Sequence, residues 1–137
     1  MRHNTPEEFL GVDVGSARVG IARGSSLARL AEPLKTIDAK TALPELKVLA
    51  VKRQASGIVV GLPRNLEGQD TAQTQLVRSW VNEAKGQIPL PFFWQDEALT
   101  TVTAENSGVK NSSVDAQAAA IILQDFLDRP EADRVRC

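Results

Sequence analysis

The stretch Phe9-Leu10-Gly11-Val12-Asp13-Val14-Gly15 alternates apolar side chains with glycine and one aspartate, which predicts a β-strand that ends at a glycine. A second apolar stretch at residues 19–23 follows after a link of only a few residues. A parallel crossover needs about a dozen residues or more, so the two strands must form an antiparallel hairpin. A third strand at residues 31–37 would complete a meander.

The apolar spacing changes after residue 38, because Leu43, Leu46 and Leu49 recur at helical intervals. The continuous apolar run at residues 57–63 is typical of a strand buried on both faces, and we expect it to be parallel to the first strand. Further along the chain, the same reasoning predicts a helix at 70–84, a strand at 90–97 and a helix at 114–127. The expected order is therefore βββαβαβα.

The composition fits one globular domain spanning residues 1–137, with 42% hydrophobic and 24% charged residues. We expect an α/β fold built on a five-stranded mixed sheet. Its first three strands would be antiparallel, the later ones would be parallel additions, and helices would cover both faces. No run reaches the roughly 18 to 20 apolar residues of a membrane span, and residues 1–6 lack an apolar signal region, so we expect a cytoplasmic protein.

The single cysteine, Cys137, is the last residue, which excludes an internal disulfide and a thiolate metal cluster. We expect it to be an inert residue at a frayed terminus. The net charge of -1 does not indicate a polyanion-binding protein, so any nucleic-acid site must be local. The candidates for such a site are Arg18, Arg23, Arg64 and Lys110.

Asp13 is the first residue that the fold alone does not explain, because a carboxylate inside an apolar strand must have its desolvation offset. A bound cation would offset it, and so would hydrogen bonds from backbone amides. Gly11 and Gly15 lie two residues to either side, on the same strand face, and we expect them to leave room for an ion or a phosphate.

Two further acidic positions fall at the ends of predicted elements. Asp96 and Glu97 close the strand at 90–97, where carboxyl ends of strands form ligand sites. Strand alternation sends their side chains to opposite faces, so only one of them can meet Asp13. Asp115 opens the last helix, where capping and the helix dipole are an alternative reason for an acidic residue.

Three carboxylates without a partnering histidine suit hard cations such as Mg²⁺ or Mn²⁺. The only histidine, His3, lies near the chain start, which leaves no basis for a Ser-His-Asp triad. Two such ions could hydrolyse a phosphodiester. Arg64, in the loop after the strand at 57–63, and Lys110 could each contact a phosphate, although solvated loop residues are the common alternative.

Four motifs in order resemble the YqgF family, also called RuvX, of Holliday junction resolvases and nucleases that mature the small-subunit ribosomal RNA precursor. The motifs are Leu10-Gly11-Val12-Asp13-Val14-Gly15 with Arg18, Gly20 and Ala22, then Ile58-Val59-Val60-Gly61-Leu62-Pro63 with Gly68, then Asp96-Glu97 with Thr100-Thr101, and Val114-Asp115 leading to Ala118-Ala119-Ile122-Leu123-Gln124. The resemblance implies a ribonuclease H-like fold with Asp13, Glu97 and Asp115 as catalytic metal ligands.

The resemblance implies a structured RNA or branched DNA substrate, with maturation of ribosomal RNA ahead of junction resolution, and a monomer or homodimer. The chain departs from the family at Ala98, where arginine is usual, and in a shorter, less basic loop before Asp115. These departures motivate a second hypothesis, a non-catalytic nucleic-acid-binding module. A third, an actin-like ATPase, shares the Asp-x-Gly turn after the first strand, but the chain offers no second glycine-rich loop or second domain.

Overall fold

The computed structural model describes residues 6–96 and 112–137 of the chain. Within these ranges six strands form one mixed sheet, three helices flank it, and two short 3₁₀ segments connect elements. Along the chain the elements are β1 (Glu8–Val14), β2 (Arg18–Ser25), β3 (Ala31–Asp38), η2 (Ala39–Thr41), α1 (Ala42–Lys52), β4 (Gly57–Leu62), α2 (Ala72–Gln87), β5 (Phe92–Asp96), α4 (Ser112–Asp128), η3 (Glu131–Asp133) and β6 (Val135–Arg136).

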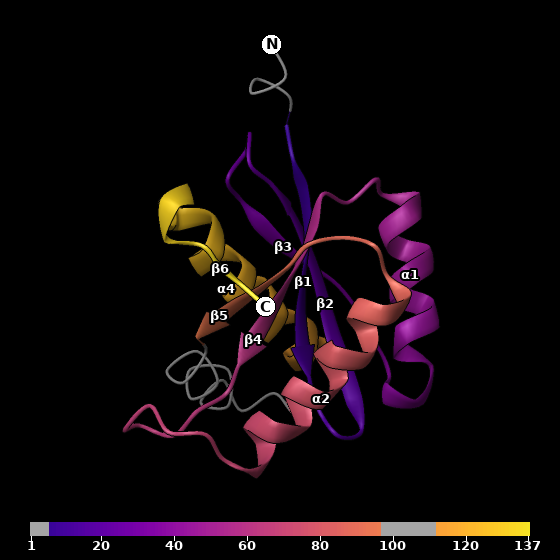
Figure 1. Ribbon diagram of the computed structural model, residues 1–137. Coiled ribbons are helices and arrows are strands. Elements are labelled where there is room, and N and C mark those ends of the chain that lie inside the picture. The colour runs from indigo at the N-terminus through magenta and orange to yellow at the C-terminus, as the bar shows by residue number, and fades with distance from the viewer. Residues whose placement is uncertain (1–5, 97–111) are drawn as a thin grey trace.

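The strand order in the sheet is β3-β2-β1-β4-β5-β6. The meander β1-β2-β3 is antiparallel, whereas β4 pairs parallel to β1 and β5 parallel to β4, as the sequence predicted. Because β1, β4 and β5 run in the same direction, their carboxyl ends meet at one edge of the sheet. Figure 1 shows α1 and α2 together on one side of these strands and α4 on the other.

The expectation of five strands was wrong, because the chain after α4 adds the short strand β6. It pairs antiparallel to β5, with Phe93 opposite Arg136 and Trp94 opposite Val135. Cys137 follows, and its backbone N–H donates to the carbonyl of Phe92 at 2.9 Å. The terminus is therefore held on the sheet rather than frayed, because β6 and Cys137 supply hydrogen-bond partners to the backbone of β5.

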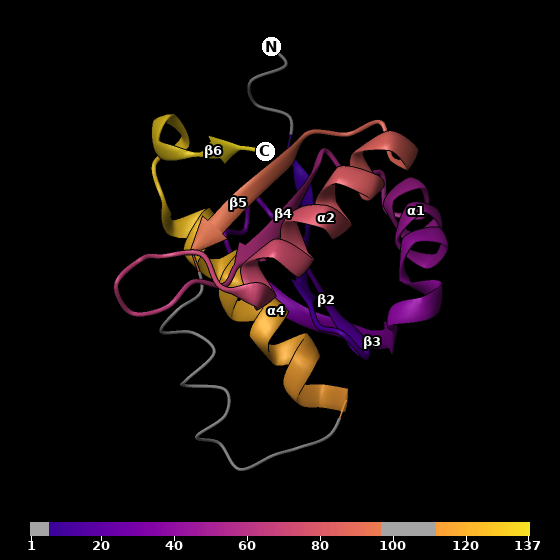
Figure 2. The same cartoon turned by 60° about the horizontal axis from the view of Figure 1, so that its bottom comes forward.

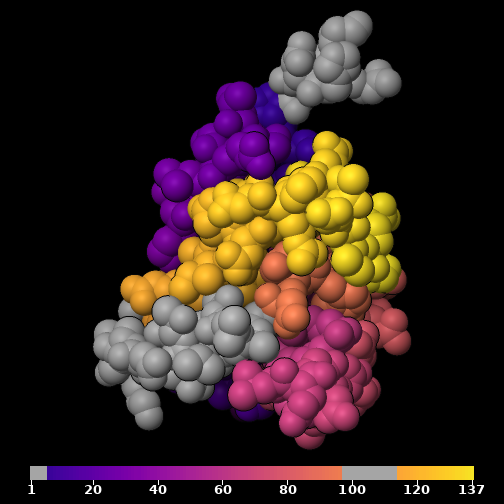
Figure 3. Space-filling model, turned by 90° about the vertical axis from the view of Figure 1, so that its left-hand side faces the viewer, coloured from indigo at the N-terminus to yellow at the C-terminus, as the bar shows by residue number. Residues whose placement is uncertain are grey.

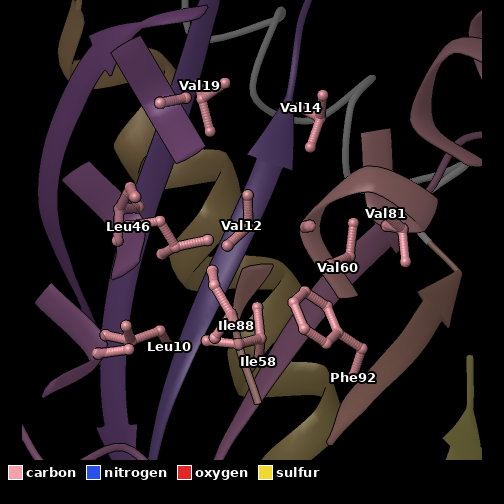
Figure 4. Close-up of a cluster of buried hydrophobic side chains, with 14 of the residues drawn as sticks. Leu10, Val12, Val14, Val19, Leu46, Ile58, Val60, Val81, Ile88 and Phe92 are labelled. Atoms are coloured by element: carbon pink, nitrogen blue, oxygen red, sulfur yellow. The ribbon is translucent and has the colours of Figure 1, made fainter. Parts of the chain in front are cut away.

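The core is divided by the sheet into two clusters. The first lies under α1 and α2 and includes Leu10, Val12 and Val14 of β1. Figure 4 shows its side chains gathered between the strands and the helices. The second lies under α4, where Phe9 meets the buried Phe126 edge to face, with ring centroids 5.2 Å apart. Alternate residues of β1 thus face opposite layers, which fixes where Asp13 points.

The polar sequence of the connection between β4 and α2 gives a loop that carries its own hydrogen bonds. The Asn65 side-chain oxygen accepts from the backbone N–H groups of Glu67 and Gln69 at 3.1 and 2.8 Å. Figure 2 shows this segment projecting from the body of the molecule. No helix among the described residues has the length and apolar character needed to cross a membrane.

Candidate metal centre

Asp13 lies near the carboxyl end of β1 and is half-buried. Phe9 belongs to the cluster under α4, whereas Leu10, Val12 and Val14 belong to the opposite cluster. Strand alternation therefore directs Asp13 to the α4 side of the sheet. Its partner across the β1-β2 ladder is Gly20.

Gly20 allows the first turn of α4 to lie directly on the sheet. A Cβ atom added at this position would collide with the backbone carbonyl of Asp115 and would stand 2.9 Å from the backbone nitrogen of Ala116. Paired residues in a ladder present the same face, so the start of α4 lies beside Asp13. The structure thus brings two of the predicted acidic residues, Asp13 and Asp115, to one edge and one face of the sheet.

The same close approach continues along α4, which the space-filling view shows extended across one face of the molecule (Figure 3). A Cβ atom on Gly11 would stand 2.8 Å from Cβ of Leu123 and 2.9 Å from the carbonyl oxygen of Ala119. The expectation that Gly11 leaves room for an ion was therefore wrong, because α4 fills that space. At Gly15, an added Cβ would stand 2.8 Å from the carbonyl oxygen of Arg18, so this glycine serves the tight turn into β2.

Arg18 forms an ion pair with Asp115, with 2.8 Å between Nε and Oδ2. The Arg18 side chain is 57% exposed and that of Asp115 23% exposed. The pair lies at the mouth of the candidate site, because Arg18 begins β2 at the edge where β1 ends. Arg18 therefore offsets the charge of one candidate ligand and can turn outward into solvent.

Arg64 is engaged within its own loop. Its Nε lies 3.4 Å from a carboxylate oxygen of Asp70, and Arg78 reaches the other oxygen of the same carboxylate at 2.9 Å. The hydrogen bond from Arg78, assisted by the charges of both arginines, lowers the pKa of Asp70 despite some desolvation. The guanidinium of Arg78 also lies over the Trp94 ring, 5.5 Å from its centroid. Asp70 thus fixes the loop at the edge of the sheet that carries Asp13.

Asp96 closes β5, and the packing of the preceding residues shows on which side of the sheet it lies. Phe92 and Trp94 pack in the cluster under α1 and α2, and Phe93 packs in the cluster under α4. Alternation therefore places Asp96, the last residue of β5, on the side opposite to Asp13. Glu97 and Lys110 lie outside the described residues.

Gln95 is a residue of this region that the sequence did not single out. It is only 6% exposed, it precedes Asp96 on β5, and it shares the α4 side of the sheet with Phe93. Its side-chain carbonyl oxygen has no hydrogen-bond donor among residues 6–96 and 112–137. The sequence did hold a signal for this residue, because Gln95 is a polar residue at a strand position that alternation predicts to be buried.

The donor chemistry of this edge fits a hard divalent cation. Asp13 and Asp115 supply carboxylate oxygens, and Gln95 adds a neutral carbonyl oxygen nearby on the same face. Within residues 6–96 and 112–137, no group of three or more His, Cys, Asp or Glu side chains is placed to hold a metal ion.

This arrangement of sheet and helices is that of RuvC, a ribonuclease H-like fold. The chain superposes on Thermus thermophilus RuvC in complex with a Holliday junction substrate with a TM-score of 0.59, over 96% of this chain and 99% of that chain. A second structure of Thermus thermophilus RuvC gives a TM-score of 0.56. Sequence identity is 14% in both, so the likeness establishes a shared fold.

The family itself follows from sequence comparison. A family model for RuvX, described as Holliday junction resolvase, matches residues 7–129, and the chain belongs to this family. Relatives named "Putative pre-16S rRNA nuclease" include a Roseiflexus sp. (strain RS-1) protein, 39% identical over 90% of this chain and 95% of its own length. A Ralstonia nicotianae protein of the same name is 34% identical over 90% of this chain and 88% of its own length.

Proposed function

We propose that this protein is a divalent-metal-dependent nuclease that hydrolyses phosphodiester bonds of structured nucleic acid, with the 5′ end of the small-subunit ribosomal RNA precursor as its substrate. The observation that carries the proposal is the contact of Gly20 with the Asp115 backbone, which sets Asp115 beside Asp13. The RuvX membership and the names of the relatives support the reaction and the substrate.

The proposed ligands are Asp13, Glu97 and Asp115. Asp13 is held by a strand paired on both sides, and Asp115 by a helix that cannot slide because its backbone rests on Gly20. Two Mg²⁺ or Mn²⁺ ions held there would activate the attacking water and stabilise the leaving oxygen. Rigid carboxylates suit this task because small displacements of catalytic groups cost much of the rate.

The cationic residues at this edge have separate tasks in the proposal. Arg18 is exposed enough to leave Asp115 and contact a phosphate when cations replace it as the partner of that carboxylate. Arg64 is tied to Asp70, so it contributes a fixed positive charge beside the loop. Lys110 completes the set of residues proposed to contact the substrate. A protein of near-neutral net charge would thus bind a polyanion through one local patch.

A cleavage assay tests the proposal. Labelled ribosomal RNA precursor and a four-way DNA junction are incubated with Mg²⁺ or Mn²⁺ and with the wild type, Asp13→Asn or Asp128→Asn. Asp128 ends α4 at the opposite pole from Asp115, so its substitution is a matched control. We expect the wild type and the control to cut the RNA, and we expect Asp13→Asn, folded by circular dichroism, or added EDTA to abolish cutting.

The same assay separates the alternatives. Cutting of the junction but not of the RNA would assign the protein to junction resolution, which the RuvX family description favours. Symmetric resolution needs two sites, so the active species would then be a dimer by light scattering. Binding without cutting by the wild type would instead support a non-catalytic module.

A further inference from the structure

A row of residues crosses the sheet on the α4 side at its carboxyl edge. The β1-β4 register ends with Val12 opposite Val60, so the next position sets Asp13 beside Gly61. Gly61 is paired in turn with Gln95 of β5. Adjacent strands lie about 4.8 Å apart, which puts Asp13 and Gln95 about 10 Å apart at their backbones. Both side chains stand on the α4 side of the sheet, one on each side of the position between them.

Gly61 contributes no side chain to that row. Val59 packs in the cluster under α4, and Ile58 and Val60 pack in the opposite cluster, so alternation puts Gly61 on the α4 side. The carboxylate of Asp13 and the carboxamide of Gln95 therefore border the Gly61 position from its two neighbouring strands.

The side chain of Gln95 has the chemistry of a ligand contact. The residue is nine-tenths buried, and its Oε1 has no donor in the part of the chain that the structure describes. A buried acceptor without a donor destabilises a fold, whereas leucine or methionine would fill the same volume without that cost. Because Oε1 itself is buried, it is shielded from a nucleotide, and a single cation or water molecule enclosed beside it would be the partner that its chemistry requires.

We propose that Gln95 is a further oxygen ligand of the metal centre, contacting a divalent cation through Oε1 either directly or through one cation-bound water. The inference rests on the proposed function and extends its set of ligands beyond the three carboxylates. A neutral oxygen is suited to this position, because it adds a ligand for Mg²⁺ or Mn²⁺ without adding repulsion between the acidic groups.

Mn²⁺ binding to the purified protein, measured by calorimetry and electron paramagnetic resonance without substrate, tests the proposal. Gln95→Leu should weaken Mn²⁺ affinity about 10-fold, which is the usual size of an effect at a supporting ligand. Gln95→Glu should tighten it, because a carboxylate replaces a neutral oxygen. Gln87→Leu and Gln87→Glu, made at the exposed end of α2, make the same chemical changes away from the site and should leave the affinity unchanged.

The outcomes distinguish this inference from the proposed function. A wild type that does not bind Mn²⁺ overturns both. A wild type that binds Mn²⁺, with unchanged affinity in both folded Gln95 variants, overturns the inference alone and leaves Oε1 to a structural water. Unchanged Mn²⁺ affinity with a reduced preference for RNA over DNA would also overturn it, by assigning Oε1 to the substrate. If Gln95→Leu does not fold, the Mn²⁺ affinity of Gln95→Glu is compared with that of Gln87→Glu, and an equal affinity of the two overturns the inference.

Discussion

The backbone carbonyl of Asp115 occupies the space that a side chain on Gly20 would need. Gly20 is also the ladder partner of Asp13. One glycine therefore sets the distance between a strand that carries one acidic residue and a helix that carries another. The placement of Asp115 beside Asp13 therefore depends on this contact.

Gly20→Ala tests that dependence. An added methyl group has only backbone to displace, so we expect a loss of about 1–3 kcal/mol in the free energy of unfolding and a marked loss of Mn²⁺ affinity. Urea denaturation and calorimetry measure the two effects. Gly86→Ala in α2, where an added Cβ meets nothing within 4 Å, is the control and should stabilise the fold by about 0.5–1 kcal/mol. Equal behaviour of the two variants would contradict the account.

Arg18→Gln should separate metal binding from substrate binding. Removal of the guanidinium frees Asp115 from a competing partner, so Mn²⁺ affinity should rise several-fold. RNA binding should weaken, and the salt dependence of its affinity should fall by about one charge if Arg18 contacts a phosphate. Arg53→Gln, which removes the same charge near the start of β1, should do neither. A fall in both affinities would show that Arg18 holds the site together.

Asp70 should titrate below its ordinary pKa of 3.8, because it accepts a hydrogen bond from Arg78. A carboxylate whose pKa is lowered in the folded state stabilises the fold at pH values above its ordinary pKa. This stabilisation is lost as the pH falls through the lowered pKa of the folded state. Carboxyl chemical shifts followed by NMR between pH 2 and pH 6, chosen as roughly the range of such groups, measure the midpoint. A midpoint at or above 3.8 would contradict the ion pairs that fix the loop.

Cys137 should be unreactive in the folded protein. Burial raises the pKa of its thiol from 9.0 to about 11, although Lys85, Arg136 and Arg78 oppose the shift. The thiolate fraction at neutral to mildly alkaline pH should then be lower by about 100-fold, and alkylation correspondingly slower than in denaturant. Fast alkylation without denaturant would mean that β6 does not hold the terminus. Because the folded state raises the pKa of the Cys137 thiol, the protonated thiol contributes to the stability of the fold below pH 9.0. That contribution is lost as the pH rises toward 11.

The sequence predicted most of the fold because its patterns are local. The short link after Asp13 required a hairpin, and the apolar run of β4 required a strand covered on both faces. The strand β6 escaped prediction because two residues carry no periodicity. Their position follows from the unpaired edge of β5, which is a property of the folded sheet.

The sequence could predict which residues belong to the candidate site, but it could predict less of how those residues are arranged in space. Asp13 and Asp115 were singled out by their positions, and strand alternation gives the face of the sheet on which Asp96 lies. The engagement of Arg64 by Asp70 and the burial of Gln95 depend on contacts between distant segments. The space near Gly11 was misjudged for the same reason, because the sequence does not reveal how closely α4 approaches the sheet.

Mn²⁺ binding to the wild type, Asp13→Asn, Asp115→Asn and Asp128→Asn tests the central claim most directly. If Asp13 and Asp115 hold the same cations, each of the first two substitutions should weaken Mn²⁺ affinity roughly 10-fold or more, and the third should have no effect. Mn²⁺ affinity equal to that of the wild type in folded Asp13→Asn and Asp115→Asn would contradict the claim that this edge of the sheet is a metal centre.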